Sequence, residues 1–415
     1  MIEFAKPRPL WRPRPIALPG PALTVRWKTE LCDRHGRVER VLQRGRNTIT
    51  NWGMDQLASS SIYSLISTLV LSSTQDTRKR ALSGGNNLTV TYTSPTNVTV
   101  VADANFFVSG DVGYTLALLN VPELKITAFT DPTHVTCQTP SGEWLPGFSV
   151  PGSPTVYSAA TIYYTSNNQL ATYFTQFSSF DTGGVTLTID NSNSQHIHQR
   201  IFLSSTVSGA DWTVNQLGWS DGNGSHNVFG VANLAGPDVI PIGKKYRVTL
   251  TVYSKFTPIN LAGVAVNWGG TIGAYTMDIR QEYIGYPVVA GGRANWLEPH
   301  ANSDSFATWS AKWWTTSHAL VSTYWQGQSG GTAPNNFDDG SGQAVVLGSY
   351  TNGQYMRTKN VRWPDTVDLS GVTALGAGVG PPMITLRPTS GTVTKPSGFW
   401  CDATFKIFWT RDLTG

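Results

Sequence analysis

The segment Tyr246–Phe256 constrains the fold of this chain more strongly than any other stretch. Its apolar residues occupy every second position and polar residues fill the gaps: Tyr246, Val248, Leu250 and Val252 against Arg247, Thr249, Thr251 and Lys255. Successive side chains of a strand point to opposite faces of a sheet, so this period of two predicts a half-buried β-strand. Leu88–Tyr92, Leu124–Ala128 and Val185–Ile189 repeat the pattern. Together they indicate antiparallel sheets.

Composition supports the same fold class. Charged residues make up 13% of the 415 residues, against about 25% in an average soluble domain. Gly, Ser, Thr and Asn take their place, and these residues favour strands and turns over long helices. We therefore predict an all-β protein of more than one domain, built from antiparallel sandwich-like or jelly-roll-like sheets with an extended N-terminal arm.

Turn signals divide the chain into an arm and two β-rich domains. The arm covers residues 1–22, and the first domain is a β-sandwich at 23–260. A run of short strands at about 84–142 predicts a small β module inserted into that sandwich. Residues 261–415 are expected to form a C-terminal β-rich domain with long loops.

Local signals refine the start of the sandwich. Leu23–Leu31 and Val38–Gln43 are predicted to pair as a hairpin. Asn51 is a good N-cap and predicts one short helix after it. Ser64–Leu71 is expected to return as a buried strand, and Asn167–Phe177 fits either a short helix or a loop.

Three further stretches are interpreted as strands. Ile197, Ile201 and Leu203 share one strand and are expected to face the core. Met277–Ile284 and Phe399–Trp409 give the clearest strand patterns of the C-terminal domain.

The arm has a composition of its own. Six prolines lie between Pro7 and Pro21. Proline lacks a backbone donor, so we expect an extended arm that adds no internal strand pairing. A disordered tail is one interpretation. The other is a peptide that anchors to a neighbouring subunit through its interleaved arginines and tryptophan: Arg8, Trp11, Arg12 and Arg14.

Positive charge is concentrated at the same end. Residues 1–46 carry eleven Lys/Arg and four acidic residues. These cations alternate with prolines and strand residues, which favours docking to an acidic protein surface over nucleic-acid binding. Arg78–Arg80 is expected to be a solvated loop or a part of the basic docking face.

Two patterns could bind metal. His196 and His198 would share one face of a strand, but no third ligand is evident, so polar residues on the solvent face are favoured. A symmetric trimer could gather six imidazoles from this pair, as in some phage fibre proteins. Asn335–Gly342 has oxygen ligands but no closing glutamate, which favours a plain polar loop over a calcium site. We expect no metal and no cofactor.

The sequence offers no coherent catalytic set. Asp181 with Asp190, or Glu282 with Glu298, could serve glycoside hydrolysis, but accidental acidic pairs are inevitable in a chain with 26 acidic residues. No nucleophile elbow, phosphate-binding loop or zinc-protease motif occurs. A non-enzymatic protein is therefore expected.

Tryptophans crowd into residues 296–325. They could fill a core or a subunit interface, or form a platform that stacks on sugar rings or on a partner. A core or interface is favoured. The candidate platform residues are Trp309, Trp313, Trp314 and Trp325.

The cysteines and the N-terminal sequence indicate the cellular compartment in which the protein is made. Cys32, Cys137 and Cys401 lie far apart and form no metal or disulfide pattern, which fits assembly in a reducing cytoplasm. No apolar run approaches the ~18 residues that span a membrane, and the N-terminus lacks an apolar signal core. Neither membrane insertion nor ordinary secretion is expected.

Three segments resemble tail and appendage proteins of tailed bacteriophages. Trp212–Phe256 is similar to a strand-turn-strand pattern of that group, and Asn47–Leu57 to its N-x-I-T-N-x-G-x-x-x-L element. Gly110–Gly113, together with Ala128–Thr136, resembles a small β module inserted in phage virion proteins. The resemblance covers about half the chain. Leu71–Thr74 departs from it, because such proteins often have a Gly-Thr-Gly turn there.

The resemblance implies a structural component of a bacteriophage virion, assembled in the host cytoplasm. It would act as a tail, tail-fibre or adaptor protein that anchors through its N-terminal region. Expected partners are copies of itself, as a trimer or higher ring, and other virion proteins. One alternative is a receptor-binding protein that takes a host surface glycan through the tryptophan-rich domain. Another is a tail-associated polysaccharide depolymerase.

Overall fold

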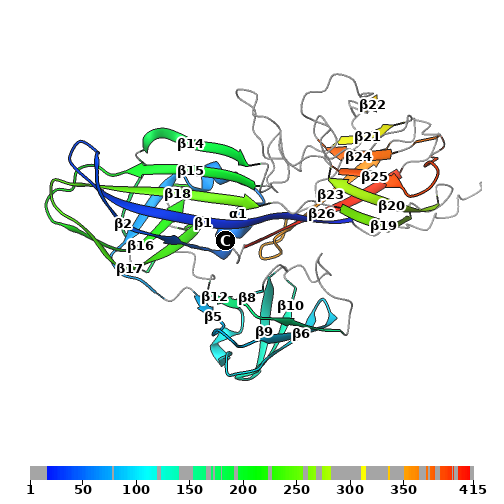
Figure 1. Ribbon diagram of the computed structural model, residues 1–415, viewed down its shortest axis with the longest axis horizontal. Coiled ribbons are helices and arrows are strands. Elements are labelled where there is room, and N and C mark those ends of the chain that lie inside the picture. Colours follow the sequence, from blue (N-terminus) through cyan, green and yellow to red (C-terminus); the bar gives the residue numbers. More distant parts are fainter. Residues whose placement is uncertain are drawn as a thin grey trace, which may run out of the picture.

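The computed structural model describes residues 16–76, 79–118, 123–139, 153–164, 170–171, 173–178, 180–190, 195–222, 227–255, 260–267, 273–281, 310–314, 335–336, 350–363, 371–372, 374–378, 384–394, 396 and 401–411. Strands account for 64% of these residues and helices for 5%, so the prediction of an all-β, multi-sheet protein is confirmed. Figure 1 shows the sheets gathered into three units.

The first unit is a β-sandwich. Its larger sheet has the strand order β14 (Phe180–Asp190), β15 (Gln195–Leu203), β18 (Lys245–Lys255), β1 (Ile16–Cys32), β26 (Cys401–Arg411) and β23 (Met356–Trp363), with β2 (Val38–Arg46) also paired to β1. The facing sheet has the order β13 (Tyr173–Phe177), β4 (Thr68–Ser72), β16 (Trp212–Ser220), β17 (Gly230–Ile240) and β3 (Thr48–Ile49). Two short helices, α1 (Asn51–Gln56) and α2 (Ile62–Leu65), connect β3 to β4.

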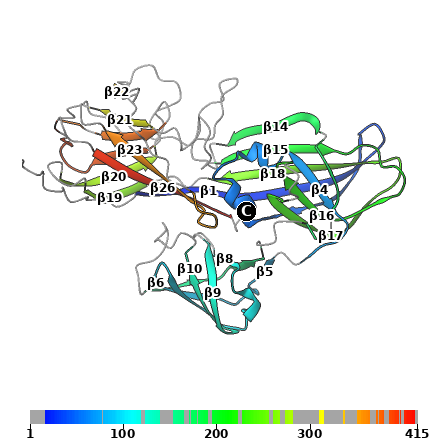
Figure 2. The same ribbon diagram turned by 180° about the vertical axis from the view of Figure 1, so that it is seen from behind.

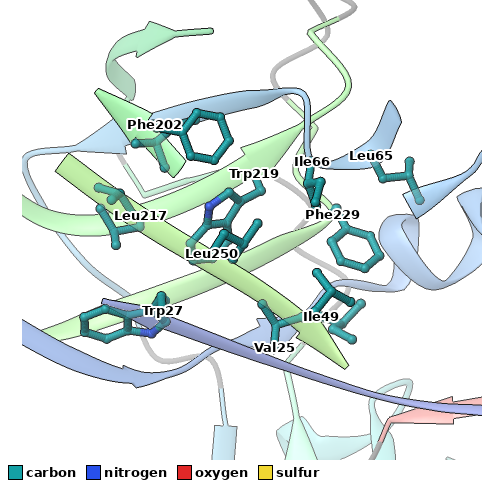
Figure 3. Close-up of a cluster of buried hydrophobic side chains, with 14 of the residues drawn as sticks. Val25, Trp27, Ile49, Leu65, Ile66, Phe202, Leu217, Trp219, Phe229 and Leu250 are labelled. Carbon is teal, nitrogen blue, oxygen red and sulfur yellow. The ribbon is translucent and has the colours of Figure 1, made fainter. Parts of the chain in front are cut away.

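The core of the sandwich draws on both sheets. Trp27 and Leu250 come from the larger sheet, whereas Leu217 and Trp219 come from the facing one (Figure 3). Trp219 is fully buried, and the buried residues of β18 are Tyr246, Val248, Leu250 and Val252, as the period of two predicts. Burying an aromatic side chain of this size stabilises the fold by about 2–3 kcal/mol.

Strand β1 runs from one β unit into another. Residues 22–32 pair antiparallel with β18, and residues 26–32 also pair with β2. Its first part then pairs in parallel with β26, from Ile16 beside Phe405 to Leu23 beside Arg411. Residues 16–22 therefore belong to a strand, whereas the sequence placed them in the arm. The pairing with β26 is interrupted between Pro19 and Ala22, where prolines lack backbone donors.

The second unit lies beside β26 and β23. A six-stranded sheet has the order β19 (Asn260–Asn267), β20 (Ala274–Gln281), β25 (Ile384–Pro388), β24 (Ala374–Gly378), β21 (Ser310–Trp314) and β22 (Asn335–Asn336). Figures 1 and 2 place this sheet at the end of β1 opposite the sandwich. Because β23 and β26 belong to the larger sheet, that sheet crosses the domain boundary expected at residue 260.

The third unit is inserted between β4 and β13. Its eight-stranded sheet has the order β11 (Pro154–Tyr157), β6 (Leu88–Ser94), β7 (Asn97–Ala102), β10 (His134–Gln138), β9 (Leu124–Asp131), β8 (Thr115–Leu118), β12 (Ala160–Tyr163) and β5 (Lys79–Ala81). It encloses a core of its own, centred on Val90, Val100 and Ile126. The insertion therefore extends beyond residues 84–142 on both sides.

Several local predictions need correction. Thr50, and not Asn51, caps helix α1, and its Oγ1 accepts the Gly53 amide at 3.0 Å. The segment Ser64–Leu71 begins inside helix α2 and becomes a strand only at Thr68. Residues 173–177 form strand β13, where a helix or a loop was expected. Asn ranks above Thr as an N-cap, so residue preference alone pointed to the wrong position.

Candidate functional site

Helix α1 rests directly on Val228 and Phe229, the two residues that lead into strand β17. Thr50 donates from its backbone to the Phe229 carbonyl at 3.0 Å, and its hydroxyl donates to the Val228 carbonyl at 2.5 Å. An added Cβ at Gly53 would lie 2.2 Å from the Phe229 oxygen, which is inside van der Waals contact. Glycine is therefore required at this position by close backbone approach.

Arg411, at the end of β26, is the centre of a buried polar junction. Its side chain is 3% exposed and forms an ion pair through Nη1 with Glu123 of the inserted unit, which is 2% exposed. Its Nε donates to the Ile49 carbonyl at 2.8 Å, and Nη2 donates to Asn51 Oδ1 at 3.0 Å. One guanidinium thus ties the inserted unit to the sandwich.

Electrostatics favour the charged form of this guanidinium. Burial opposes the charge, but Glu123 and two tyrosines outweigh burial and raise the pKa of Arg411. The rings of Tyr163 and Tyr355 lie 5.5 and 5.8 Å from the guanidinium carbon, within cation–π distance. Charge pairing and hydrogen bonding together offset the cost of placing an ion in the interior.

The segment Tyr350–Tyr355 closes the junction from the other side. Asp55 Oδ1 accepts hydrogen bonds from the Tyr350 hydroxyl and from the Gly353 amide, at 2.5 and 2.6 Å. Trp409 donates from Nε1 to the Met54 carbonyl at 2.8 Å and stacks on Tyr350. Helix α1 therefore contacts segments that lie about 300 residues further along the chain.

Tyr355 adopts a left-handed backbone conformation with φ of 48°. Its carbonyl accepts from the Trp409 amide at 3.1 Å, and its buried ring lies by Arg411. A non-glycine residue holds this conformation only where its surroundings impose it. The junction is consequently a tightly specified packing site, which we call the α1 junction: Ile49, Asn51, Asp55, Glu123, Tyr163, Tyr350, Tyr355, Trp409 and Arg411.

Asp55 makes the α1 junction sensitive to pH. Burial raises the pKa of its carboxyl above the usual value of 3.8. A raised pKa means that the folded state holds this proton more tightly, so its contribution to stability is present below about pH 4 and is lost as pH rises through the folded-state value. Asp55→Asn keeps the accepting oxygen but does not titrate. We expect the wild type to lose stability relative to this variant as pH rises above about 4.

Urea unfolding at a series of pH values measures the difference. Asp55→Ala, which also removes the acceptor, should be less stable than both proteins at every pH. Parallel curves for the wild type and Asp55→Asn would contradict the expectation.

The inserted unit holds a second buried ion pair. Asp111 is fully buried and pairs with Arg80, while it also accepts the Val108 amide at 2.8 Å. The Arg80 guanidinium lies over the rings of Phe106 and Tyr164. The expectation of a solvated loop at Arg78–Arg80 is therefore wrong for Arg80, which is half-buried in β5 because its charge is needed beside Asp111; Arg78 lies outside the described residues.

The turn after β9 is organised by another carboxylate. Asp131 Oδ1 accepts from the Thr133 amide and hydroxyl, both at 2.7 Å, and from His134 Nδ1 at 3.0 Å. These hydrogen bonds lower the pKa of Asp131 to about 2. The residues of this turn have a local structural role.

The two histidines lie inside the sandwich. His196 and His198 are 2% and 0% exposed, so the prediction that they occupy the solvent face is wrong. They share the buried face of β15 with Arg200 and Phe202, and Ile197, Ile201 and Leu203 take the other face, opposite to expectation. Arg200 donates to the Ile66 carbonyl at 3.2 Å, and the His198 ring packs edge-on against Tyr63, so helix α2 accommodates polar side chains here.

No group of three metal-ligating side chains occurs within the described parts of the chain. Asp190 accepts from Gln195 Nε2 at 2.9 Å in the β14–β15 pair. The side chain of its proposed partner Asp181 is not described, and Glu282 and Glu298 lie outside the described residues. Asn335 and Asn336 form β22, and the remainder of that loop is likewise outside.

The residues expected to bind partners fall mostly outside the described ranges. Arg8, Trp11, Arg12, Arg14, Trp309 and Trp325 all lie there. Trp313 and Trp314 are placed in β21, beside Leu375 and Ala374 of β24, but their side chains are not described. Cys32, Cys137 and Cys401 are all buried.

Neither the family models nor the curated proteins nor the solved structures that were compared with this chain give a match. Fold and site together define an all-β protein of several sheets with a buried polar junction at its centre. The helices within the described ranges are too short to cross a membrane. Sequence patterns missed Glu123 and Arg411, although Asn51 of the N-x-I-T-N element was a signal for this region.

Proposed function

We propose that this chain is a non-enzymatic structural component of a bacteriophage virion: a tail, tail-fibre or adaptor protein. The α1 junction carries the proposal. Its central ion pair is buried and its polar groups are engaged with one another. This arrangement suits a component whose β units must keep a fixed relative geometry under load.

Segments that resemble phage tail proteins contribute to such packing. Asn51 accepts from Arg411, and Gly53 permits the close approach of α1 to the backbone of Phe229. Asp111 of the Gly110–Gly113 segment is the buried partner of Arg80. The resembling residues thus hold units together, which favours a structural role for them.

Self-association is part of the proposal. Strands β14 and β23 end the strand order of the larger sheet, and β13 ends that of the facing sheet. Sheet edges present backbone donors and acceptors that a neighbouring chain can pair with. A trimer or a higher ring, joined to other virion proteins, would cover these edges.

Electron microscopy tests the assignment directly. Particles produced from the genome that encodes this chain would be purified, labelled with gold-conjugated antibody against it, and imaged. Label at a fixed position on the particle is expected. Purified particles that lack the protein, both in these images and by mass spectrometry, would refute the proposal.

The arm provides a second test. Deletion of residues 2–15 leaves all of β1 in place, since the strand begins at Ile16. We expect this variant to fold with an unchanged melting temperature but to be at least tenfold depleted from particles, because the arm anchors to a neighbour. A deletion of residues 2–22 would also remove the pairing with β26 and serves as the destabilised comparison. Normal incorporation of the shorter deletion would contradict anchoring by the arm.

A further inference from the structure

The outward face of the β1–β2 hairpin carries four cations in a block. Arg26 lies opposite Arg46, and Lys28 lies opposite Arg44, in the antiparallel register of the two strands. Arg26, Arg44 and Arg46 are exposed, and the Lys28 side chain is 39% exposed. We call Arg26, Lys28, Arg44 and Arg46 the basic quartet.

This arrangement is unfavourable for the isolated fold. Directly opposed residues of an antiparallel pair have Cβ atoms about 4.5–5.5 Å apart, and like charges there are destabilising. Glu30 compensates only partly: it pairs with Lys28 at 2.7 Å and has Arg247 at 3.7 Å. Within the described part of the chain, no carboxylate lies within ion-pair distance of Arg26, Arg44 or Arg46.

The face retains a net positive charge. The quartet, Arg247 and Glu30 together comprise five cations and one carboxylate, and their net charge is five minus one, or +4. Repulsion between like charges that lowers stability and is nevertheless retained on an exposed surface is typical of a binding surface. Its charge calls for an anionic partner.

Neighbouring residues distinguish between classes of anion. Val41 lies opposite Glu30 and Val38 opposite Cys32, so the register places both valines on the face of the quartet. They are 42% and 41% exposed. Arginines beside exposed apolar side chains are typical of protein interfaces, whereas surfaces that bind nucleic acid are more polar and more strongly basic.

The described outward-facing residues around the quartet offer no unoccupied aromatic ring on which a nucleic-acid base could stack. Among the described outward-facing residues of β1, β2 and β18, the aromatic side chain is Tyr253, and the Arg26 guanidinium lies over it at 5.2 Å. Proteins that bind single-stranded nucleic acid without sequence preference rely on accessible aromatic platforms. This observation favours a protein partner over a nucleic acid.

We infer that the basic quartet docks an acidic polypeptide surface of a neighbouring subunit, whose Asp and Glu side chains pair with the exposed guanidinium groups. Alternate residues of a strand lie about 7 Å apart, so carboxylates at every second position of a partner strand would match the two rows of the quartet. The inference rests on the proposed anchoring function and specifies the chemistry of the partner.

Substitution of two quartet members in the full-length chain tests the inference. Arg44→Gln/Arg46→Gln removes two charges, and Arg34→Gln/Arg37→Gln removes the same charge from exposed positions in and beside the hairpin turn. Binding to fluorescein-labelled poly-L-glutamate would be measured by anisotropy at low and at physiological salt, with duplex DNA as the second probe. We expect the quartet variant to bind poly-L-glutamate about five- to tenfold more weakly and the turn variant less than twofold.

Stability supplies an independent readout. Removing opposed like charges should leave the urea midpoint of the quartet variant unchanged or raise it. A lower midpoint would instead assign these cations a structural role and overturn the inference. Equal weakening in both variants would show that binding depends on net charge and not on the quartet, which would overturn the inference. Quartet-dependent binding that is tighter for DNA than for poly-L-glutamate would also overturn it, because the face would then bind nucleic acid.

The virion role and the binding role of the quartet are tested by different experiments. Absence of the protein from purified particles would refute the virion role, while the poly-L-glutamate comparison would still decide whether the quartet selects carboxylates. Conversely, a protein that is found in particles but whose quartet variant binds poly-L-glutamate like the wild type would keep its virion role and lose this interface.

Discussion

Replacement of Arg411 by methionine is expected to lower the free energy of unfolding by about 3–5 kcal/mol. Methionine approximates the length of the side chain but leaves Glu123 as a buried charge without its partner. It also removes the donors to the Ile49 carbonyl and to Asn51. Urea denaturation followed by tryptophan fluorescence measures the loss, and Trp409 lies within the affected region.

Two further variants make this experiment specific. Arg362→Met breaks the ion pair with Asp402 on the neighbouring strands, but both side chains are 31% exposed, so we expect a loss of about 1 kcal/mol or less. Adding Glu123→Gln to Arg411→Met removes the stranded charge and should restore part of the stability. A loss for Arg411→Met as small as that for Arg362→Met would show that the α1 junction does not depend on its ion pair.

The second large effect is expected at Gly53, where a single methyl group should cost about 3 kcal/mol or more. The added Cβ would meet the Phe229 carbonyl oxygen and its neighbouring backbone atoms at 2.2–2.9 Å, and a backbone cannot give way as a flexible side chain does. Helix α1 would have to move away from Val228 and Phe229, which would disturb the hydrogen bonds that Thr50 makes to their carbonyls.

Gly110→Ala is the matched control, because an added Cβ at Gly110 has no atom within 4 Å. Thermal unfolding of the two variants should give a clear fall in melting temperature for Gly53→Ala and almost none for Gly110→Ala. Gly53→Ala with wild-type stability would mean that α1 does not pack against Phe229 as described.

Sequence patterns predicted the strands well where alternation was strong. In β6 and β18 the alternating apolar residues are the buried ones, since each strand has one face toward a core. In β9 this holds for Leu124 and Ile126, whereas Ala128 is exposed beyond the register shift in the pairing with β10. The pattern failed on β15, where His196, His198 and Arg200 are buried beside Phe202. Ile197, Ile201 and Leu203 are only partly buried. Hydrophobicity assigns faces only when the interior is apolar, and this interior holds polar groups beside helix α2.

The α1 junction could not be predicted from the sequence, because its members are far apart along the chain. Glu123 and Arg411 are 288 positions apart, and Asp55 and Tyr350 are 295 positions apart. Nothing local marks such residues as partners. The element around Asn51 indicated that the region matters, but its role as an acceptor for Arg411 depends on the path of β26.

The parallel pairing of Ile16 with Phe405 cannot form until nearly the whole chain has been synthesised. The first residues of β1 leave the ribosome long before β26 exists, and at about 5–20 residues per second the wait for a partner is roughly 20–80 s. Throughout that time an open strand edge can pair with the wrong chain. A messenger truncated before residue 401 would leave that edge permanently open. Such fragments are expected in the insoluble fraction. Because the strand that covers this edge is synthesised last, incomplete chains would aggregate and would not enter assemblies.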